Sequence, residues 1–173
     1  WESNNIQGTE YDDVIDADAL RSANNDYERD WIDAGQGDDW VNGGAGGDQI
    51  VGGAGNDTID GGDQSYAERL TGVMDPWQLE NRVQYSTKAK FYDITKAVDD
   101  DGSVTGQAGT VYFTVTDTRT DALDGVDVLF NIDALQFSDK EVRLTPQVWV
   151  DKQWSNTPDG QPSEVVRGVN IDA

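Results

Sequence analysis

The sequence predicts a mainly β protein in which a repeat of short strands is followed by an antiparallel β segment and one short helix. Three observations predict this fold class. Asp and an aliphatic residue return every nine residues within the first 62 positions, apolar residues alternate at Val111, Phe113 and Val115, and glycine-rich turns separate the apolar runs. Short, evenly spaced apolar runs between turn residues are typical of strands rather than helices.

The charge of the chain excludes several classes of partner. Its 12 Lys and Arg stand against 34 Asp and Glu, which leaves a formal net charge of −22. Such a surface repels nucleic acid and anionic lipid, so we expect no nucleic-acid binding and no membrane insertion. No apolar run approaches the ~20 residues of a membrane-spanning helix. Because the same charge repels itself, divalent cations are the expected counter-ions of the compact state.

The chain contains neither cysteine nor histidine. It therefore lacks thiolate and imidazole metal ligands, disulfides and the usual histidine general base, and we expect no catalytic residues. The opening WESNNIQGTEYDD has neither the basic nor the apolar region of a signal peptide. We expect the chain to be one module of a larger multidomain protein.

The repeat becomes visible when the sequence is divided into blocks of nine residues. Blocks 43–51 and 52–60 read GGAGGDQIV and GGAGNDTID, and the blocks that begin at residues 7, 25 and 34 keep Asp at the sixth position and Val or Ile at the eighth. Glycine lets backbone carbonyls converge, and Asp adds an anionic oxygen, which together form a donor set suited to Ca²⁺. The alternative is that GG and ND mark hairpin turns of an ordinary sheet.

This pattern resembles the RTX nonapeptide GGxGxDxUx, firmly over residues 25–62 and more loosely over 7–62. The resemblance implies a parallel β-roll in which two nonapeptides make one turn. Six residues of each repeat would form a calcium loop, and three would form a short strand whose Val or Ile fills a narrow core between two stacked sheets. The implied fold is a short parallel calcium β-roll packed against the antiparallel β segment.

Several Ca²⁺ ions are expected between loops that stack on one another. Like loops would recur every second repeat, so the aspartates should form two columns with a spacing of 18 residues, Asp12–Asp30–Asp48 and Asp39–Asp57. The resemblance implies the following metal ligands: Asp12, Asp30, Gly35, Gly37, Asp39, Gly44, Gly46, Asp48, Gly53, Gly55 and Asp57.

The pattern is interrupted at two places. Block 16–24, DADALRSAN, places Arg21 where the second column needs an Asp, and we expect this block to bulge out as an insertion or short helical turn. The next place in the first column falls on Tyr66, where the metal ligands are expected to end.

Beyond Gly62 the nine-residue spacing fails and other elements are predicted. An Asp-Pro pair with Gln78 three residues after the Asp is typical of a helix start and predicts a short helix over about 76–82. KFYDITKAVDD and TVYFTVTDTR are apolar runs around an Asp/Gly loop and predict an antiparallel strand pair. One more strand is expected at 148–150.

Residues 124–139 have the form D-x6-N-I-x-x-L-x-F-x-D. This form resembles a segment commonly found after RTX blocks. The resemblance implies a cap that closes the open end of the roll, whose strand edges would otherwise be unpaired. One integrated domain is expected, with three parts: the roll with its insertion at 16–24 in residues 1–65, the helix and capping β segment in 66–150, and an extension or linker in 151–173.

Other acidic residues are candidates for further calcium sites. Asp99 and Asp101 belong to an acidic run before Gly102, and the alternative is that they form a solvated hairpin loop. Four later aspartates flank a predicted strand and turn: Asp117, Asp121, Asp124 and Asp127.

Two tryptophans are candidates for ligand contact. Trp31 and Trp40 both fill the seventh position of the repeat, which points away from the core of a roll. Exposed tryptophans could stack on a sugar or grip a peptide. The alternative is that the later segment folds back and buries them.

The resemblance implies a function outside the cell. The expected function is that of a calcium-dependent ligand-binding module of a secreted or surface-bound bacterial RTX adhesin. Its partner would be an extracellular peptide, protein or glycan on a target cell. The alternative is a non-catalytic RTX module that aids folding and secretion of an extracellular hydrolase, lyase or epimerase.

Overall fold

Two six-stranded sheets lie face to face and form the body of the molecule. The computed structural model describes residues 4–20, 29–62, 80–144, 154–156 and 162–164. The first sheet has the order β1 (Asn5–Thr9), β3 (Trp31–Gln36), β5 (Gln49–Ala54), β7 (Arg82–Gln84), β11 (Ala134–Gln136) and β12 (Glu141–Arg143). The second has the order β2 (Val14–Asp16), β4 (Trp40–Asn42), β6 (Thr58–Asp60), β10 (Val126–Phe130), β9 (Thr110–Asp117) and β8 (Tyr92–Asp99).

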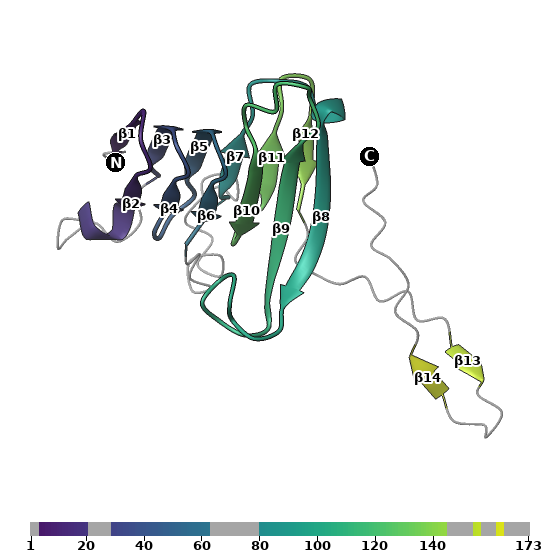
Figure 1. Cartoon of the computed structure of the whole chain (residues 1–173). Helices are drawn as coiled ribbons and strands as arrows, with labels where there is room; N and C mark the ends of the chain where they lie inside the picture. The colour runs from purple at the N-terminus through teal and green to yellow at the C-terminus, as the bar shows by residue number, and fades with distance from the viewer. Residues whose placement is uncertain (1–3, 21–28, 63–79, 145–153, 157–161, 165–173) are drawn as a thin grey trace.

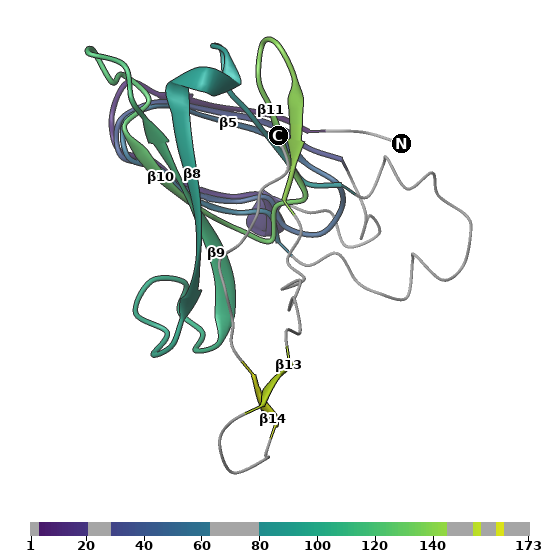
Figure 2. The ribbon, with the colours of Figure 1, turned by 90° about the vertical axis from the view of Figure 1, so that its right-hand side faces the viewer.

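The chain winds between the two sheets in a roll, as Figure 2 shows by looking along the stack of strands. Strands β1, β3, β5, β7 and β11 pair in parallel, as do β2, β4, β6 and β10. Strands β8, β9 and β12 pair antiparallel at the other end. The predicted mainly β fold, a parallel β-roll packed against an antiparallel segment, is confirmed (Figure 1).

The short elements outside the sheets include two 3₁₀ helices, η1 (Ala17–Leu20) and η3 (Ala89–Phe91). Strands β13 (Trp154–Asn156) and β14 (Pro162–Glu164) pair antiparallel with each other. Among the described residues, no helix is long and apolar enough to cross a membrane.

The number of residues between successive turns of the roll is not constant. Asp30 and Asp48 contact each other 18 residues apart, as predicted, whereas Asn4 and Asp30 are 26 residues apart. The additional residues lie between β2 and β3, where Asp16 ends a strand and η1 provides the expected short helical turn. The predicted column of Asp12, Asp30 and Asp48 is therefore wrong at its first member, because a constant spacing does not hold across an insertion.

The roll continues past the predicted boundary at residue 65. Val83 of β7 stacks on Ile50, and Leu129 of β10 stacks on Ile59, so later segments supply further turns of the roll. The helix predicted over 76–82 is wrong at its end, because Arg82 begins a strand whose pairing with β5 outweighs the local helix signal. Residues 76–79, Tyr66 and the strand expected at 148–150 lie outside the described residues.

Aliphatic side chains from both sheets fill the space inside the roll. Seven aliphatic side chains of the core are at most 1% exposed: Ile32, Ile50, Val83 and Leu135 from the first sheet and Val41, Ile59 and Leu129 from the second. At the capping end, the rings of Tyr85, Tyr92 and Phe137 pack with centroids 4.8 to 5.3 Å apart. The same stripe of core therefore passes from the repeats into the capping segment without a break.

A glycine allows the capping segment to stack on the last repeat loop. Gly125 has a φ of +62°, and a Cβ there would lie 2.3 Å from the carbonyl oxygen of Gly55. A Cβ on Gly55 would likewise lie 2.1 Å from the carbonyl oxygen of Gly37. The backbone before β10 therefore lies on the loop before β6 as closely as the repeat loops lie on each other.

Replacing Gly125 by alanine should destabilise the junction between the repeats and the cap. We expect Gly125→Ala to lower the free energy of unfolding by more than the ~1–2 kcal/mol of left-handed strain alone, because the Cβ also meets backbone. Gly109→Ala is the matched control, since Gly109 has a φ of +85° but a Cβ there meets nothing within 4 Å. Equal losses for the two variants in urea unfolding would contradict the close stacking.

Candidate metal centre

The same three-residue pattern of Asp or Asn, any residue and an aliphatic residue lies at the start of each parallel strand of the roll; its Asp or Asn directly precedes the strand except in β10, where Asp127 is the second residue. The pattern occurs nine times at the starts of parallel strands. The first sheet contains Asn4-Asn5-Ile6, Asp30-Trp31-Ile32, Asp48-Gln49-Ile50, Asn81-Arg82-Val83 and Asp133-Ala134-Leu135. The second contains Asp13-Val14-Ile15, Asp39-Trp40-Val41, Asp57-Thr58-Ile59 and Asp127-Val128-Leu129. The aliphatic residue enters the core, and the Asp or Asn lies at the corner of the roll.

The first corner is the side where the chain passes from the first sheet to the second. Its column consists of Asp13, Asp39, Asp57 and Asp127. The backbone N–H of each of the first three donates to Oδ1 of the next, at 2.8 to 3.0 Å. One carboxylate oxygen of each later aspartate is thus used to hold the neighbouring turn.

The second corner is the side where the chain returns from the second sheet to the first. Its column consists of Asn4, Asp30, Asp48, Asn81 and Asp133. Here too each backbone N–H donates to the side-chain oxygen of the next member, at 2.9 to 3.1 Å. The two corners therefore share one bonding scheme, although the sequence distance between members varies.

Asp12 belongs to neither of these columns. Its Oδ1 accepts the backbone N–H of Asp38, and Asp38 in turn accepts the N–H of Asn56, at 2.9 and 2.8 Å. Asp13 takes the place predicted for an aspartate at the first turn, and it stacks on Asp39 rather than on Asp30. Asp12 therefore lies in an outer row at the first corner.

Two buried carboxylate oxygens at the first corner have no hydrogen-bond partner. They are Oδ2 of Asp39 and Oδ2 of Asp57, on residues that are 2% and 1% exposed. Burial raises the pKa of Asp39 and raises that of Asp57 to about 6. An unpaired buried carboxylate is costly, and a bound cation would remove that cost.

Glycines leave room around these oxygens. A Cβ on Gly52 would lie 2.3 Å from Oδ2 of Asp57, so the loop 52–57 can close on its own aspartate only with glycine there. The loop glycines predicted as ligands all have positive φ, which turns successive carbonyls in different directions: Gly35, Gly37, Gly44, Gly46, Gly53 and Gly55.

The donor set fits calcium. Carboxylate and carbonyl oxygens are hard donors, which Ca²⁺ prefers in flexible sets of six to eight. Among the described residues, no group of three or more acidic side chains could hold a metal ion by itself. An ion at the first corner would therefore take the Oδ2 atoms of Asp39 and Asp57 together with backbone carbonyls of the two glycine loops, and calcium would supply the charge that these buried oxygens lack.

Where the two columns pass from the repeats to the cap, protein groups form hydrogen bonds at both corners. At the first corner, the Tyr85 hydroxyl donates to Oδ2 of Asp127 at 2.7 Å. At the second corner, the Asn81 amide donates to the carbonyl oxygens of Gly61 and Asn131 at 2.6 and 3.0 Å. Burial raises the pKa of Asp127 to about 8 and that of Tyr85 well above its usual value.

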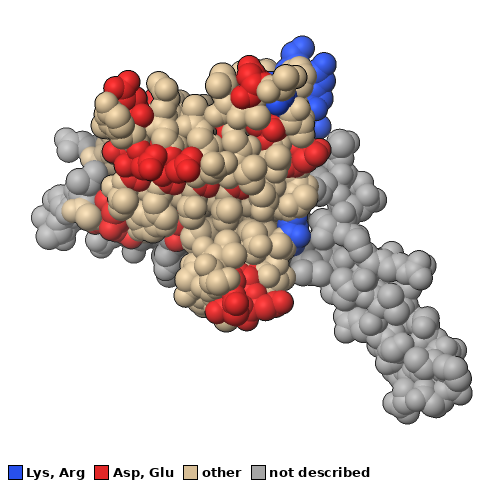
Figure 3. Space-filling model, in the orientation of Figure 1, with Lys and Arg blue, Asp and Glu red and all other residues tan. Residues whose placement is uncertain are grey.

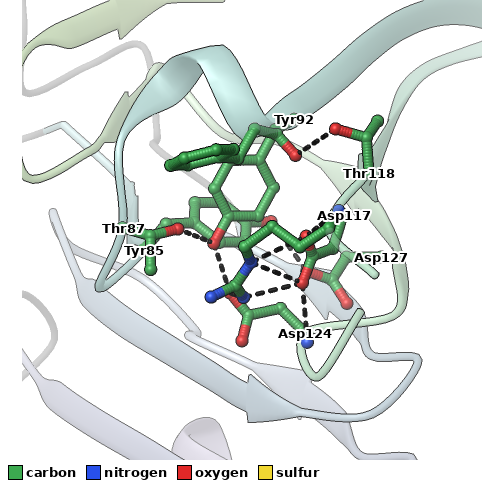
Figure 4. A network of polar contacts seen from close by, with 9 residues as sticks. Tyr85, Thr87, Tyr92, Asp117, Thr118, Asp124 and Asp127 are labelled. Atoms are coloured by element: carbon green, nitrogen blue, oxygen red, sulfur yellow. Dashed lines mark hydrogen bonds and ion pairs between the residues drawn. The ribbon is translucent and has the colours of Figure 1, made fainter. Parts of the chain in front are cut away.

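Beside Asp127, an ion-pair network fixes the turn before β10 (Figure 4). Arg119 donates Nε and Nη2 to the buried Asp117 at 2.7 to 3.1 Å, and its Nη2 also lies 3.3 Å from Asp124. Tyr92 donates to Asp124, while Arg119 lowers the pKa of Asp117. Four later aspartates were predicted as candidates for a calcium site. Two of them, Asp117 and Asp124, thus share the guanidinium group of Arg119 as their counter-charge.

Asp99 organises a hairpin loop between β8 and β9. Its Oδ2 accepts the backbone N–H of Val104 and both the N–H and hydroxyl of Thr105, at 2.7 to 3.0 Å, and these donors lower the pKa of Asp99. Asp101 accepts the N–H of Ser103 at 3.0 Å. These contacts match the hairpin-loop alternative, and among the described residues the two do not converge on a common point with a third acid.

The two candidate tryptophans lie on opposite faces. Trp31 is the first residue of β3 in one sheet, and Trp40 is the first residue of β4 in the other. They are 40% and 39% exposed, so the described segments do not bury them. Trp40 pairs with Val14, which is 80% exposed. The structure therefore does not join the two rings in one binding surface.

Acidic side chains gather along the repeats and at the hairpin tip in the face shown in Figure 3, while Lys and Arg in that view lie mainly toward the capping end. Both acidic regions of that face, along the repeats and at the hairpin tip, would attract cations.

Sequence reasoning did not assign five residues to the columns, although it named Asp127 as a candidate for a further calcium site: Asn4, Asp13, Asn81, Asp127 and Asp133. The signal was present, because Gly125, Asp127 and Leu129 keep the spacing of the fourth, sixth and eighth repeat positions. Asn81-Arg82-Val83 keeps the strand-start pattern with Asn for Asp. A search for the short pattern without a fixed step would have found all five.

Comparison with known proteins supports the nature of the repeats. The family model of the RTX calcium-binding nonapeptide repeat (4 copies) matches residues 1–19, 26–50 and 43–65. No curated protein matches the sequence. Among solved structures, the chain is similar to the AlgE6R3 subunit from the Azotobacter vinelandii mannuronan C5-epimerase, with 18% identity, 90% of each chain covered and a TM-score of 0.24.

Replacing Asp57 by asparagine should separate its two roles. The substituted amide would keep an oxygen for the N–H of Asp39 but lose the anionic Oδ2, so we expect calcium to be required at roughly tenfold higher concentration or more. Without calcium, Asp57→Asn should be at least as stable as the wild type, because a buried charge is removed. Calcium titrations followed by circular dichroism would test this, with the exposed Asp93→Asn as a control for charge. An unchanged calcium midpoint would remove Asp57 from the ligands.

The pair of Asp117 and Arg119 should make stability depend on pH. Since the folded state lowers the pKa of Asp117, this pair stabilises the protein above the unfolded pKa of about 4, and the contribution is lost as the pH falls through the lower folded value. At pH 7 we expect Asp117→Asn to lose about 1–3 kcal/mol. Urea unfolding at pH 7 and near pH 3 should show the gap to the wild type closing, and a gap that does not depend on pH would contradict the ion pair.

Proposed function

We propose that this chain, which carries RTX calcium-binding nonapeptide repeats in its first 65 residues, is a calcium-ordered module of a secreted bacterial protein. The observation that carries the proposal is the pair of buried, unpartnered oxygens on Asp39 and Asp57 in adjacent glycine loops. Without a cation these oxygens destabilise the roll, and with one they join its turns. Calcium would therefore decide whether the repeats are folded.

The concentrations outside a cell suit this role. Extracellular calcium modules bind with dissociation constants of about 10⁻⁴ to 10⁻³ M. When free calcium exceeds the dissociation constant about a hundredfold, each ion adds ~2.7 kcal/mol to the stability of the folded state. Two or three such ions are enough to fold a marginal domain, and they would also offset part of the net charge of −22. A chain kept unfolded in the calcium-poor cell interior would fold after export.

Calcium titration of the whole chain tests this proposal. We expect the repeats to lose their secondary structure in excess chelator and to regain it cooperatively when calcium is added, with magnesium far less effective because it demands a smaller octahedral site. Circular dichroism and calorimetry would measure the transition and the number of ions. A melting temperature that is the same in chelator and in millimolar calcium would overturn the proposal.

A second candidate function is ligand binding by the ordered roll, as in a bacterial RTX adhesin. Trp40 and Val14 form an exposed apolar strip on the second sheet, and such a strip suits a peptide or the face of a sugar ring. Titration with peptide and glycan libraries tests it: binding that needs calcium and is lost in Trp40→Ala but not in Trp31→Ala supports this role. Calcium-driven folding with no ligand in either library favours the non-catalytic folding and secretion module of an extracellular enzyme.

A further inference from the structure

We propose that the Asn81 amide and the Tyr85 hydroxyl take the places of metal ions where the two columns pass from the repeats to the cap, so that the roll is joined to its cap by hydrogen bonds instead of calcium. This inference rests on the proposed function, because it concerns where the calcium-dependent part of the chain ends. It predicts that the corner at Asn81 is a latent metal site that a single substitution can restore.

Asn81 lies where a repeat would place an aspartate. It is fully buried, and its Oδ1 accepts the backbone N–H of Asp48 at 2.9 Å, as the Oδ1 of Asp48 does for Asp30. A Cβ on Gly61 would lie 2.6 Å from Nδ2 of Asn81, just as a Cβ on Gly43 would lie 2.8 Å from Oδ2 of Asp48. The amide nitrogen therefore occupies the position that the second carboxylate oxygen has one turn earlier.

The surroundings of that nitrogen are those of a cation. Nδ2 of Asn81 donates its two hydrogens to the carbonyl oxygens of Gly61 and Asn131, at 2.6 and 3.0 Å. A carboxylate in the same place would set an anionic oxygen against two carbonyl oxygens. Oxygens of that kind converge around a hydrogen-bond donor or a cation, and in the wild-type protein the two N–H bonds of the neutral amide are the donors.

Tyr85 serves the same purpose at the other corner. Oδ1 of Asp127 accepts the N–H of Asp57, as in the earlier members of that column, but its Oδ2 accepts the Tyr85 hydroxyl at 2.7 Å. The Oδ2 atoms of Asp39 and Asp57 have no hydrogen-bond partner. The phenol, which comes from the residue after β7 and is 8% exposed, thus supplies to Asp127 the proton donor that these two aspartates lack.

The two protein groups that take the places of metal ions lie at the same level of the stack of strands. Asn81 and Tyr85 flank β7, which pairs with β5, the last repeat strand of the first sheet. Beyond this level the chain is held by the aromatic cluster of Tyr85, Tyr92 and Phe137 and by the ion pairs of Arg119. Metal dependence therefore ends at β7 on both corners, and the cap needs no calcium to stay attached.

Converting Asn81 to aspartate tests the latent site. We expect Asn81→Asp to bind one calcium ion more per chain than the wild type, to unfold at lower temperature in chelator, and to regain most of that loss in calcium above roughly 10⁻³ M. Gln107→Glu, which adds the same charge in the exposed hairpin loop, should change neither quantity. Isothermal titration calorimetry gives the stoichiometry, and thermal unfolding with and without calcium gives the recovery.

Tyr85→Phe provides an independent test at the first corner. Removing the hydroxyl leaves Oδ2 of Asp127 without a hydrogen-bond partner, like Oδ2 of Asp57. We therefore expect the loss of stability of this variant relative to the wild type to be larger in chelator than in calcium.

An Asn81→Asp chain that folds only with calcium supports the inference. Unchanged stoichiometry together with equal losses in chelator and calcium for both variants overturns it, and so does an Asn81→Asp chain that stays unfolded in calcium. Failure of the wild type itself to bind calcium would instead overturn the proposed function.

Discussion

The structure depends on one contact, in which a side-chain oxygen at a corner of the roll accepts the backbone N–H of the neighbouring turn. Strands β2, β4 and β6 have three residues each, so they form few ladder hydrogen bonds and bury one side chain each, and these strands alone cannot fix the register between turns. The corner contact fixes the register, because it joins one side-chain oxygen to the backbone N–H of one residue in the neighbouring turn. This contact uses only one of the two oxygens of a carboxylate. The second oxygen is then buried beside the glycine loops, where its charge must be neutralised.

The sequence predicted this arrangement well only where the nine-residue step is unbroken. Between residues 30 and 60 the spacing alone places Asp30 on Asp48 and Asp39 on Asp57. It fails at Asp12 because eight more residues separate the first two turns, the difference between 26 and 18, and the chain closes by contacts rather than by counting. The short strand-start pattern marks Asn81 and Asp127, but it does not say on which turn each one stacks, because long segments precede them and the stacking depends on tertiary pairing.

The two ends of the continuous core are stabilised in different ways. The repeats are rich in glycine and acid and bury small aliphatic side chains, so they carry an electrostatic cost that an ion must offset. The cap buries aromatic rings and pairs its acids with arginine, so it carries its own counter-charges. The exposed tryptophans belong to neither core, and their location on separate faces means that any ligand would meet one sheet of the roll at a time.

The unequal steps between turns have a consequence for how such a protein can change. The same corner contact joins residues that are 18, 26, 33 and 70 positions apart in the sequence. The stacking of the turns therefore does not depend on the length of the segment between successive strands. Loop closure of longer segments costs little more than that of shorter ones. A segment such as the β8–β9 hairpin can therefore be inserted, lost or exchanged at a corner of the roll without a change in the register of the strands. New surfaces can arise there without any redesign of the repeats.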